Sequence, residues 1–491
     1  MALHTQSHCG THQPDHHKLL KPPHVAIVPT LGIGHLTPLV ELAKRLVVHH
    51  NFSVTFIIPN DGSLLASQKK VLEALSTLSI SYVLLPPVSF DDLPDDVMIE
   101  TKIGLTLTRS LSALRDSVRV LNKSTRLVSL VVDHFGAEAF DVALEFRVSP
   151  YMFLPNSAMS LLFIFHMPHL HETTSCEYRD MPEPVQLPGC VPLHGRDFGD
   201  GLQDRTSPTY KVLMHVINKY GSAAGIMVNS FVDLEPGAFK ALKEQGKGVP
   251  PVYPVGPVIK TGSIDGFDGN KCLRWLDKQP NGSVLFVSFG SGGTFSQEQL
   301  NELALGLELS RHRFIWVVKS PNETAKSASY FSVKGEENPL GFLPNGFLER
   351  TKDVGLVVPT WAPQVEVLNH RSTGGFLTHC GWNSILESIV HGVPLIAWPL
   401  YAEQKMNKVL LVDGLKVALG VKENKKGIVE SQDVANYVRD LIEGDEGKLL
   451  REKMKEYKEA SKLVLAETGS STKSLAEVAQ IWKGFNSPTN L

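Results

Sequence analysis

Two stretches of this chain share a pattern in which an apolar strand runs into a glycine-rich turn and then into a helix. The first is Val25–Pro29, followed by the turn TLGIGH and the helical stretch LTPLVELAKRLVVHH. The second is Ser283–Ser291, followed by the helical stretch SQEQLNELALGLELS. This unit repeats in doubly wound parallel sheets. The sequence therefore predicts an α/β protein with two Rossmann-like domains that face each other across a cleft.

Further short apolar runs extend both halves as predicted buried strands. In the first half they are Ser53–Ile58, Ser81–Pro86, Leu127–Asp133, SPYMFLP and Gly225–Ser230, and in the second half RFIWVVK, GLVVPTW, GGFLTH and PLIAWP. The segment from His169 to Pro208 lacks periodicity and is predicted to form long loops. Polar helices are predicted from about Ser431 onward. Because open α/β sheets bind ligands at the carboxyl ends of their strands, we expect the site in the cleft.

Changes in composition along the chain predict the domain boundaries. The stretch from Pro250 to Asn270 is dense in proline and glycine and is typical of a linker. Before His24 the chain is rich in histidine, and Pro14 opposes a helix there, so we expect a disordered leader rather than a metal site. The predicted units are the leader (1–23), a first Rossmann-like domain (24–250), a linker (251–271), a second Rossmann-like domain (272–465) and a C-terminal helix that packs back on the first domain (466–491).

The charge balance excludes some classes of partner. The chain has 48 Lys and Arg against 51 Asp and Glu, which gives no electrostatic reason to expect nucleic acid or an anionic membrane. No apolar run is long enough for a membrane span, and the N-terminal stretch has no signal-peptide core. Its five cysteines form no CxxC pair, which favours a reducing compartment. We expect a cytoplasmic monomer.

The stretch from 361 to 404 carries the chemistry of a nucleotide-sugar site. In HCGWNS, Gly381 permits a tight turn, and Asn383 and Ser384 lie where a helix begins. The free backbone N–H groups of a helix start attract phosphate oxygens, and His379 at the strand end adds a donor. One turn further on, Glu387 suits vicinal ribose hydroxyls.

Three more side chains of this stretch suit the rest of a nucleotide sugar. Trp361 follows its own strand and offers a flat face to a nucleobase. Glu403 and Gln404 follow the next strand and suit several sugar hydroxyls. Base, ribose, diphosphate and sugar each have a candidate partner.

The opening WAPQ, the central HCGWNS, the ESI and the closing Glu-Gln pair resemble the plant secondary-product glycosyltransferase box of the inverting UDP-glycosyltransferases. The resemblance implies the GT-B fold, UDP-glucose as co-substrate and no metal or other cofactor. It implies that Trp361 and Ala362 bind uracil, that Gln364 and Glu387 bind ribose, that His379, Asn383 and Ser384 bind the diphosphate, and that Trp382, Glu403 and Gln404 contact the sugar. Ser291, in FGSGGT, matches a second phosphate position, and we assign Tyr401 to the same donor site. This chain has Glu403 where many relatives have Asp, and both residues supply a carboxylate at this position. The final Gln is associated with glucose.

Two residues at strand ends are the predicted catalytic pair. His35 closes the turn after the first strand, and Asp133 ends Leu127–Asp133 in the same predicted sheet. A phenol is a weak nucleophile until a base removes its proton, and an Asp partner fixes the tautomer of a histidine base and stabilises the imidazolium. Direct attack on the anomeric carbon predicts inversion to a β-glucoside.

The acceptor pocket is predicted in the first domain. Phe135 lies two residues after Asp133, Phe90 lies on a loop, and Phe163 belongs to the apolar run Phe153–Leu170. From about His24 to Lys483, runs such as LPGCVPLHGRDF, PPVYPVGP and FLPNGFLERTK are similar to a branch of the family that handles simple phenols and phenylpropanoids. The expected acceptor is a small phenol such as hydroquinone.

Two other functions suit two Rossmann-like halves. A nicotinamide-dependent oxidoreductase is opposed by TLGIGH, which lacks a full GxGxxG, and by Val54–Ile58, which offers no acidic residue for a ribose. A non-catalytic binding protein of the same fold would be expected to have lost the base or its partner, and both are present.

Overall fold

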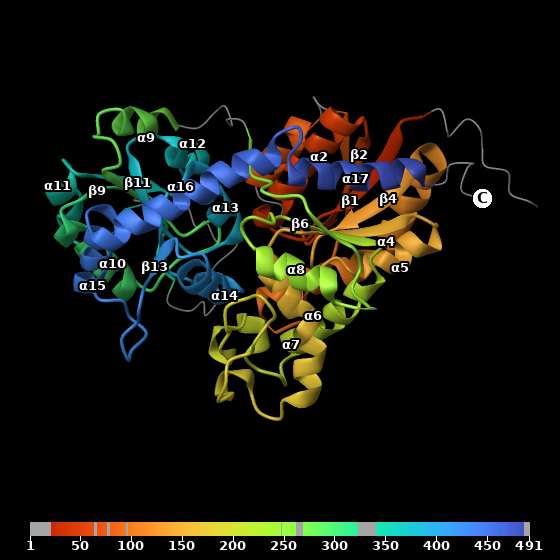
Figure 1. Ribbon diagram of the computed structural model, residues 1–491, viewed down its shortest axis with the longest axis horizontal. Coiled ribbons are helices and arrows are strands. Elements are labelled where there is room, and N and C mark those ends of the chain that lie inside the picture. The colour runs from red at the N-terminus through yellow and green to blue at the C-terminus, as the bar shows by residue number, and fades with distance from the viewer. Residues whose placement is uncertain are drawn as a thin grey trace, which may run out of the picture.

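The computed structural model describes residues 21–62, 66–75, 79–94, 97–246, 248–261, 269–322 and 340–485. Within these ranges it contains two separate parallel sheets, one in each half of the chain, as the sequence predicts (Figure 1). The histidines predicted to belong to a leader lie outside the described residues. The first strand begins at Pro23, one residue before the predicted start of the first domain.

The first sheet has the strand order β3-β2-β1-β4-β5-β6-β7, and neighbouring strands pair in parallel. Its strands are β1 (Pro23–Val28), β2 (Ser53–Asn60), β3 (Ile80–Pro87), β4 (Arg126–Val132), β5 (Ser149–Leu154), β6 (Gly225–Val228) and β7 (Val252–Pro254). Its helices are α2 (Ile33–His50), α3 (Ala66–Ala74), α4 (Ile99–Ser124), α5 (Ala139–Glu145), α6 (Ala158–Thr173), α7 (Pro208–Asn218) and α8 (Pro236–Glu244). The order reverses between β1 and β4, so their carboxyl ends frame a crevice.

The second sheet has the order β10-β9-β8-β11-β12-β13 and reverses between β8 and β11. Its strands are β8 (Val284–Ser288), β9 (Arg313–Val318), β10 (Gly355–Pro359), β11 (Thr373–Thr378), β12 (Leu395–Ala397) and β13 (Ala418–Gly420). Its helices are α9 (Gly269–Leu276), α10 (Gln297–Ser310), α11 (Phe347–Thr351), α12 (Gln364–Asn369), α13 (Trp382–His391), α14 (Gln404–Val409), the π-helical turn η6 (Leu410–Gly414) and α15 (Ser431–Ile442). Both central strands, β1 and β8, are buried along their whole length, which explains the apolar runs Val25–Val28 and Val284–Val287 within them.

The structure corrects three sequence-based expectations. The predicted linker contains β7, in which Tyr253 is buried against Tyr151 of β5. Three residues among prolines give no strand signal, but an edge strand tolerates proline. The strand β13 was not predicted either, because it also has only three residues. The predicted loop from His169 begins inside α6, which continues past Pro168 to Thr173, and the rest contains the 3₁₀ turns η2 (Tyr178–Asp180), η3 (Gly195–Asp197) and η4 (Asp200–Leu202).

The last two helices run from the second sheet back to the first. α16 (Asp445–Leu465) packs on α13, and α17 (Ser470–Gly484) packs on β7, α2 and β4 (Figure 1). Trp482 of α17 is fully buried edge-on against Phe52 and Tyr151, with ring centroids 5.9 and 5.1 Å away. The end of the chain therefore completes the core of the first unit.

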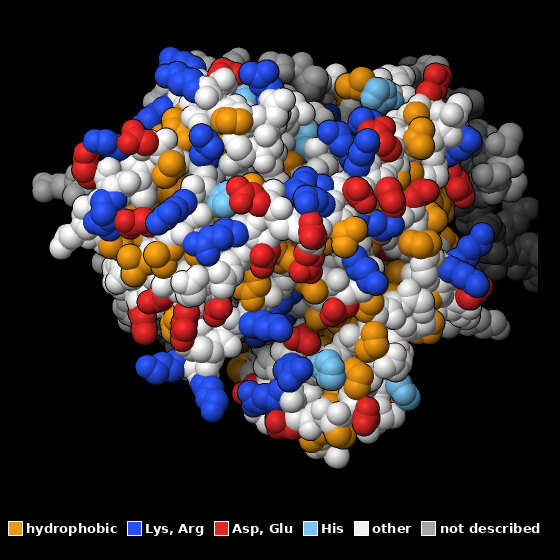
Figure 2. Space-filling view, turned by 60° about the vertical axis from the view of Figure 1, so that its left-hand side comes forward, with side chains coloured by type: hydrophobic (Ala, Val, Ile, Leu, Met, Phe, Trp, Pro, Cys, Tyr) orange, Lys and Arg blue, Asp and Glu red, His pale blue; other side chains and the backbone are white. Residues whose placement is uncertain are grey.

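The surface carries both signs of charge. On the face drawn in Figure 2, the Lys and Arg side chains are interspersed with Asp and Glu, and no broad basic area is visible there. Among the described helices, none combines the length and the apolar character needed to cross a membrane.

Candidate active site

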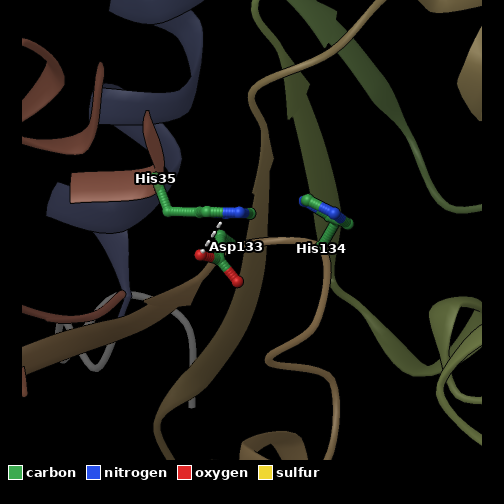
Figure 3. A group of neighbouring side chains, drawn as sticks. All are labelled: His35, Asp133 and His134. Carbon is green, nitrogen blue, oxygen red and sulfur yellow. Dashed lines mark ion pairs between the residues drawn. The ribbon is translucent and has the colours of Figure 1, made fainter. Parts of the chain in front are cut away.

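His35 and Asp133 meet at the crevice between β1 and β4. His35 is the third residue of α2, Asp133 directly follows β4, and the His35 Nδ1 and Asp133 Oδ2 atoms are 3.1 Å apart (Figure 3). The two atoms lie within ion-pair distance, and the contact is an ion pair when the His35 ring is protonated. Neighbouring parallel strands bring together two side chains that are far apart in the sequence.

The Asp133 carboxylate is fully buried and held from several sides. Its Oδ2 accepts hydrogen bonds from the Thr30 backbone N–H (2.9 Å) and hydroxyl (2.6 Å), and its Oδ1 accepts one from the Phe135 N–H (3.2 Å). Burial alone would raise the pKa of Asp133, but His35, His134 and the Thr30 hydroxyl outweigh it, and the pKa lies below its ordinary value. A charged Asp133 can stabilise an imidazolium at position 35.

A second histidine flanks the pair. The His134 ring stacks on His35, with centroids 5.0 Å apart and planes at 27° (Figure 3). It also contacts the ring of Phe135, with centroids 4.2 Å apart. Burial, and then the charge of His35, lowers the pKa of His134 to about 3, so His134 is neutral when His35 takes up a proton. Possible ligand atoms of His35, Asp133 and His134 lie within 4.8 Å of one another. A metal ion there would compete with Thr30 for the Asp133 oxygens.

A tight turn joins β11 to α13. Cys380 has a φ of 65°, and a Cβ added at Gly381 would lie 2.5 Å from His379 Nε2, so only glycine fits. Burial, and then the charge of Lys319, lowers the pKa of His379 to about 3. A neutral His379 ring and the free N–H groups at the start of α13 form a cradle suited to an anion.

Polar side chains of α12 and α13 meet beside this cradle. Gln364 Nε2 donates hydrogen bonds to Ser384 Oγ (2.9 Å) and to Glu387 Oε2 (2.7 Å). Burial raises the pKa of Glu387 to about 7. Trp361, after β10, is 41% exposed, while the neighbouring Ala362 is buried. The structure thus brings together the residues assigned to ribose and leaves an aromatic face near them.

The sugar end lies after β12. Gln404 Oε1 accepts hydrogen bonds from the backbone N–H groups of Leu400 (2.9 Å) and Tyr401 (3.1 Å), which fixes the orientation of its amide. Burial raises the pKa of Glu403, and the charge of His35 opposes that rise. Glu403 therefore lies within electrostatic reach of the candidate base, although the two belong to different sheets.

Two hydrogen bonds cross the cleft from the start of α13. Asn383 Nδ2 donates to the carbonyl of Gly34 (2.8 Å), directly before His35, and Trp382 Nε1 donates to the carbonyl of Asn229 (2.7 Å). The N–H group of the buried Trp382 indole is thus already used in a hydrogen bond to the first unit. We therefore expect Trp382 to contact a sugar through its backbone.

The remaining predicted site residues lie at different distances from the histidines of the site. Ser291 is exposed in the loop after β8, and the buried Tyr401 ring lies 6.4 Å from that of His379. Of the predicted acceptor residues, Phe135 lies 6.0 Å from the His35 ring and packs with Leu31 and Ile103.

The other two predicted acceptor residues lie elsewhere. Phe90 lies under the guanidinium of Arg109 at 5.2 Å. Phe163 is in the main core, with its ring 4.6 Å from that of Phe198, and it does not belong to the small cluster with Phe135.

Sequence reasoning missed Thr30, His134 and Asn229. The position of His134 directly after Asp133 was a usable signal. The roles of Thr30 and Asn229 depend on side-chain and carbonyl directions, which no pattern of residue types reveals.

The fold and the site define a glycosyltransferase of two facing Rossmann-like units, and comparison with known proteins agrees. The family model "UDP-glucoronosyl and UDP-glucosyl transferase" matches residues 269–454. Hydroquinone glucosyltransferase of Rauvolfia serpentina is 60% identical over 95% of this chain and 99% of its own length. UDP-glycosyltransferase 72B1 of Arabidopsis thaliana is 55% identical over 94% of this chain and 97% of its own length. Phytolacca americana UGT2, solved with UDP-2fluoro-glucose and pterostilbene, matches with a TM-score of 0.87 and 52% identity, covering 94% of this chain and 100% of that one. This chain belongs to the UDP-glycosyltransferase family.

Proposed function

We propose that this chain transfers glucose from UDP-glucose to the hydroxyl of a small phenol, with inversion, to give a β-glucoside. The observation that carries the proposal is the hydrogen bond from Asn383 to the Gly34 carbonyl, which joins the anion cradle to the turn that bears His35. An enzyme of this class needs its base and its leaving-group site in one cleft, and this contact supports that arrangement.

In the proposed donor complex, uracil lies against Trp361 and the backbone of Ala362, and the ribose hydroxyls bond Gln364 and Glu387. The diphosphate occupies the start of α13, with Ser291, His379, Asn383 and Ser384 as donors. The glucose hydroxyls face Glu403 and Gln404, beside Tyr401 and the backbone of Gly381 and Trp382. The hydrogen bonds within this set support the assignment, because they pre-orient the side chains before the donor arrives.

The proposed reaction is a single displacement. His35 Nε2 removes the phenolic proton while the phenolic oxygen attacks the anomeric carbon from the face opposite the diphosphate. The bond from the anomeric carbon to the phosphate oxygen breaks, and its electron pair leaves with UDP. Asp133 stabilises the imidazolium, and the start of α13 takes up the charge that develops on UDP. No metal ion has a part in this scheme.

The proposed acceptor site is the apolar cluster of Leu31, Ile103 and Phe135 next to His35. Its apolar lining and its single base favour a flat aromatic acceptor over a sugar, which would need several polar partners. Among structural relatives, Phytolacca americana UGT2 was solved with pterostilbene. A UDP-glucosyltransferase of Polygonum tinctorium capable of glucosylating indoxyl was solved with 3,4-dichloroaniline and matches with a TM-score of 0.87 and 50% identity, over 94% of this chain and 99% of that one.

We further propose that residues 24–250, together with the edge strand β7, bind the acceptor, that residues 272–465 bind the donor, and that the stretch between β7 and residue 272 joins them. A cytoplasmic location and a monomeric state complete the proposal. The four described cysteines carry free thiols, which accords with a reducing compartment.

Incubation with UDP-glucose and a panel of phenols, including hydroquinone, tests the function. We expect UDP release and a product with the mass of a phenol glucoside. UDP binding without turnover of any phenol would instead identify a non-catalytic member of the fold. A failure to bind UDP would contradict the donor assignment.

A further inference from the structure

Lys319 carries a charge that the proposed mechanism does not use. It directly follows β9, and its Nζ donates a hydrogen bond to the carbonyl of Gly290 at 2.6 Å. Burial lowers the pKa of Lys319 to about 8, so the ammonium still predominates at neutral pH. Lys319 lines a small hollow with Gly290, Gly293 and Thr294, in the loop after β8.

This ammonium lies next to the anion cradle. Gly290 packs so closely on the cradle histidine that an added Cβ would lie 2.5 Å from His379 Nε2. The charge of Lys319 is also one of the two causes that keep the His379 ring neutral. Lys319, Gly290 and His379 thus form one packed group at the carboxyl ends of β8, β9 and β11.

The charge of Lys319 has no ionic partner among the described residues, whose ion pairs do not include it. A partly buried ammonium without a counter-ion is costly, and such charges are usually paired. The other groups of the cradle, His379, Asn383 and Ser384, are neutral. A diphosphate in that cradle would supply the missing negative charge.

We propose that Lys319 is a charge-compensating and positioning residue of the donor site, which holds the Gly290 loop against His379 and offsets the charge of the UDP diphosphate. This inference rests on the proposed function. As the anomeric bond breaks, the charge on UDP grows, so the attraction to Lys319 is stronger in the transition state than in the bound donor.

Titration calorimetry with UDP and with UMP tests the inference on the full chain. At an effective dielectric of about 20, the attraction between two opposite unit charges about 6 Å apart changes affinity on the order of 100-fold. We therefore expect Lys319→Met to bind UDP at least 10-fold more weakly than the wild type. UMP lacks the second phosphate, so its affinity should fall less. Lys319→Arg, which keeps the charge, should bind UDP within about threefold of the wild type.

The matched control is Lys352→Met, which removes an exposed lysine paired with Glu349 and should leave both affinities unchanged. Equal losses for UDP and UMP in Lys319→Met would reveal a merely structural role and overturn the inference, as would wild-type affinity for UDP. Lys319→Gln provides a second neutral variant with the same expectations if the Met variant folds poorly. A wild type that fails to bind UDP would instead contradict the proposed function itself.

Discussion

A histidine on a helix is chemically ordinary until its neighbours are specified, and at the residue scale His35 owes its proposed role to three of them. Asp133 supplies the counter-charge, Thr30 holds Asp133 through two hydrogen bonds, and His134 stacks on the ring while remaining neutral. The buried carboxylate is thereby kept ionised next to an imidazole that can gain a proton.

Replacement of Thr30 tests this support. Thr30→Val removes the hydroxyl that donates to Asp133 Oδ2 at 2.6 Å but keeps the backbone hydrogen bond. Loss of a hydrogen bond to a charged group costs about 1.5–3 kcal/mol, so we expect kcat to fall about 10-fold or more. Thr30→Ser keeps the hydroxyl and should retain most activity. If steady-state kinetics with UDP-glucose and a phenol give equal kcat values for the two variants, the hydroxyl has no such role.

The His35–Asp133 pair and the donor segment were predictable from the sequence because both follow strands whose apolar runs are unmistakable. Chain order and residue type predicted where these residues lie, whereas their roles were predicted from the resemblance to the glycosyltransferase family. The side-chain directions of Phe90 and Phe163 did not follow from type, since an aromatic residue in an apolar run packs equally well in a core or in a pocket. The acceptor side was therefore the weaker part of the prediction.

At the scale of elements, the turns at the carboxyl ends of the strands position the chemistry, while hydrogen bonds inside the sheets keep the strands in register. The start of α13 reaches both the turn before His35 and the carbonyl of Asn229. Within the first sheet, buried His24 of β1 bonds Ser53 and Thr55 of β2 at 2.7 and 2.9 Å. Such polar pairs inside a parallel sheet make pairing sensitive to protonation.

Acid should therefore destabilise the first sheet through His24. Burial lowers the pKa of His24 from 6.5 to about 4, so the unfolded chain binds the proton first as the pH falls. With respect to His24, the free energy of unfolding is at its full value above pH 6.5. It falls by about 3 kcal/mol as the pH is lowered from 6.5 to about 4. His24→Gln cannot titrate there, and urea unfolding at pH 7 and pH 4.5 should show a smaller loss for this variant. An identical loss in both proteins would contradict the role of His24.

At the scale of the whole molecule, the two units depend on each other through the C-terminal helices. α16 leaves the second unit and α17 completes the first, so the last part of the chain stabilises the part that carries His35. The doubly wound pattern of both halves was visible in the sequence. The strand β7 was not, because three residues among prolines carry too little pattern.

Trp482 links α17 to the core of the first unit. Trp482→Ala removes a fully buried ring from Phe52 and Tyr151, and we expect a loss of about 3–5 kcal/mol in stability. The matched control is Ile481→Ala, on the same helix. The wild-type Ile481 is 43% exposed, so this variant should lose far less stability. Thermal unfolding that is equally shifted in both variants would show that α17 does not depend on this contact.

The central claim is that a base in the first unit acts on a donor held by the second. The most direct measurement compares wild type and His35→Ala for two quantities: formation of hydroquinone glucoside from UDP-glucose, and the Kd for UDP. We predict a β-glucoside from the wild type, at least a 1,000-fold slower product formation from His35→Ala, and UDP affinities within about threefold of each other. Glucoside formation by His35→Ala at the wild-type rate would contradict the account.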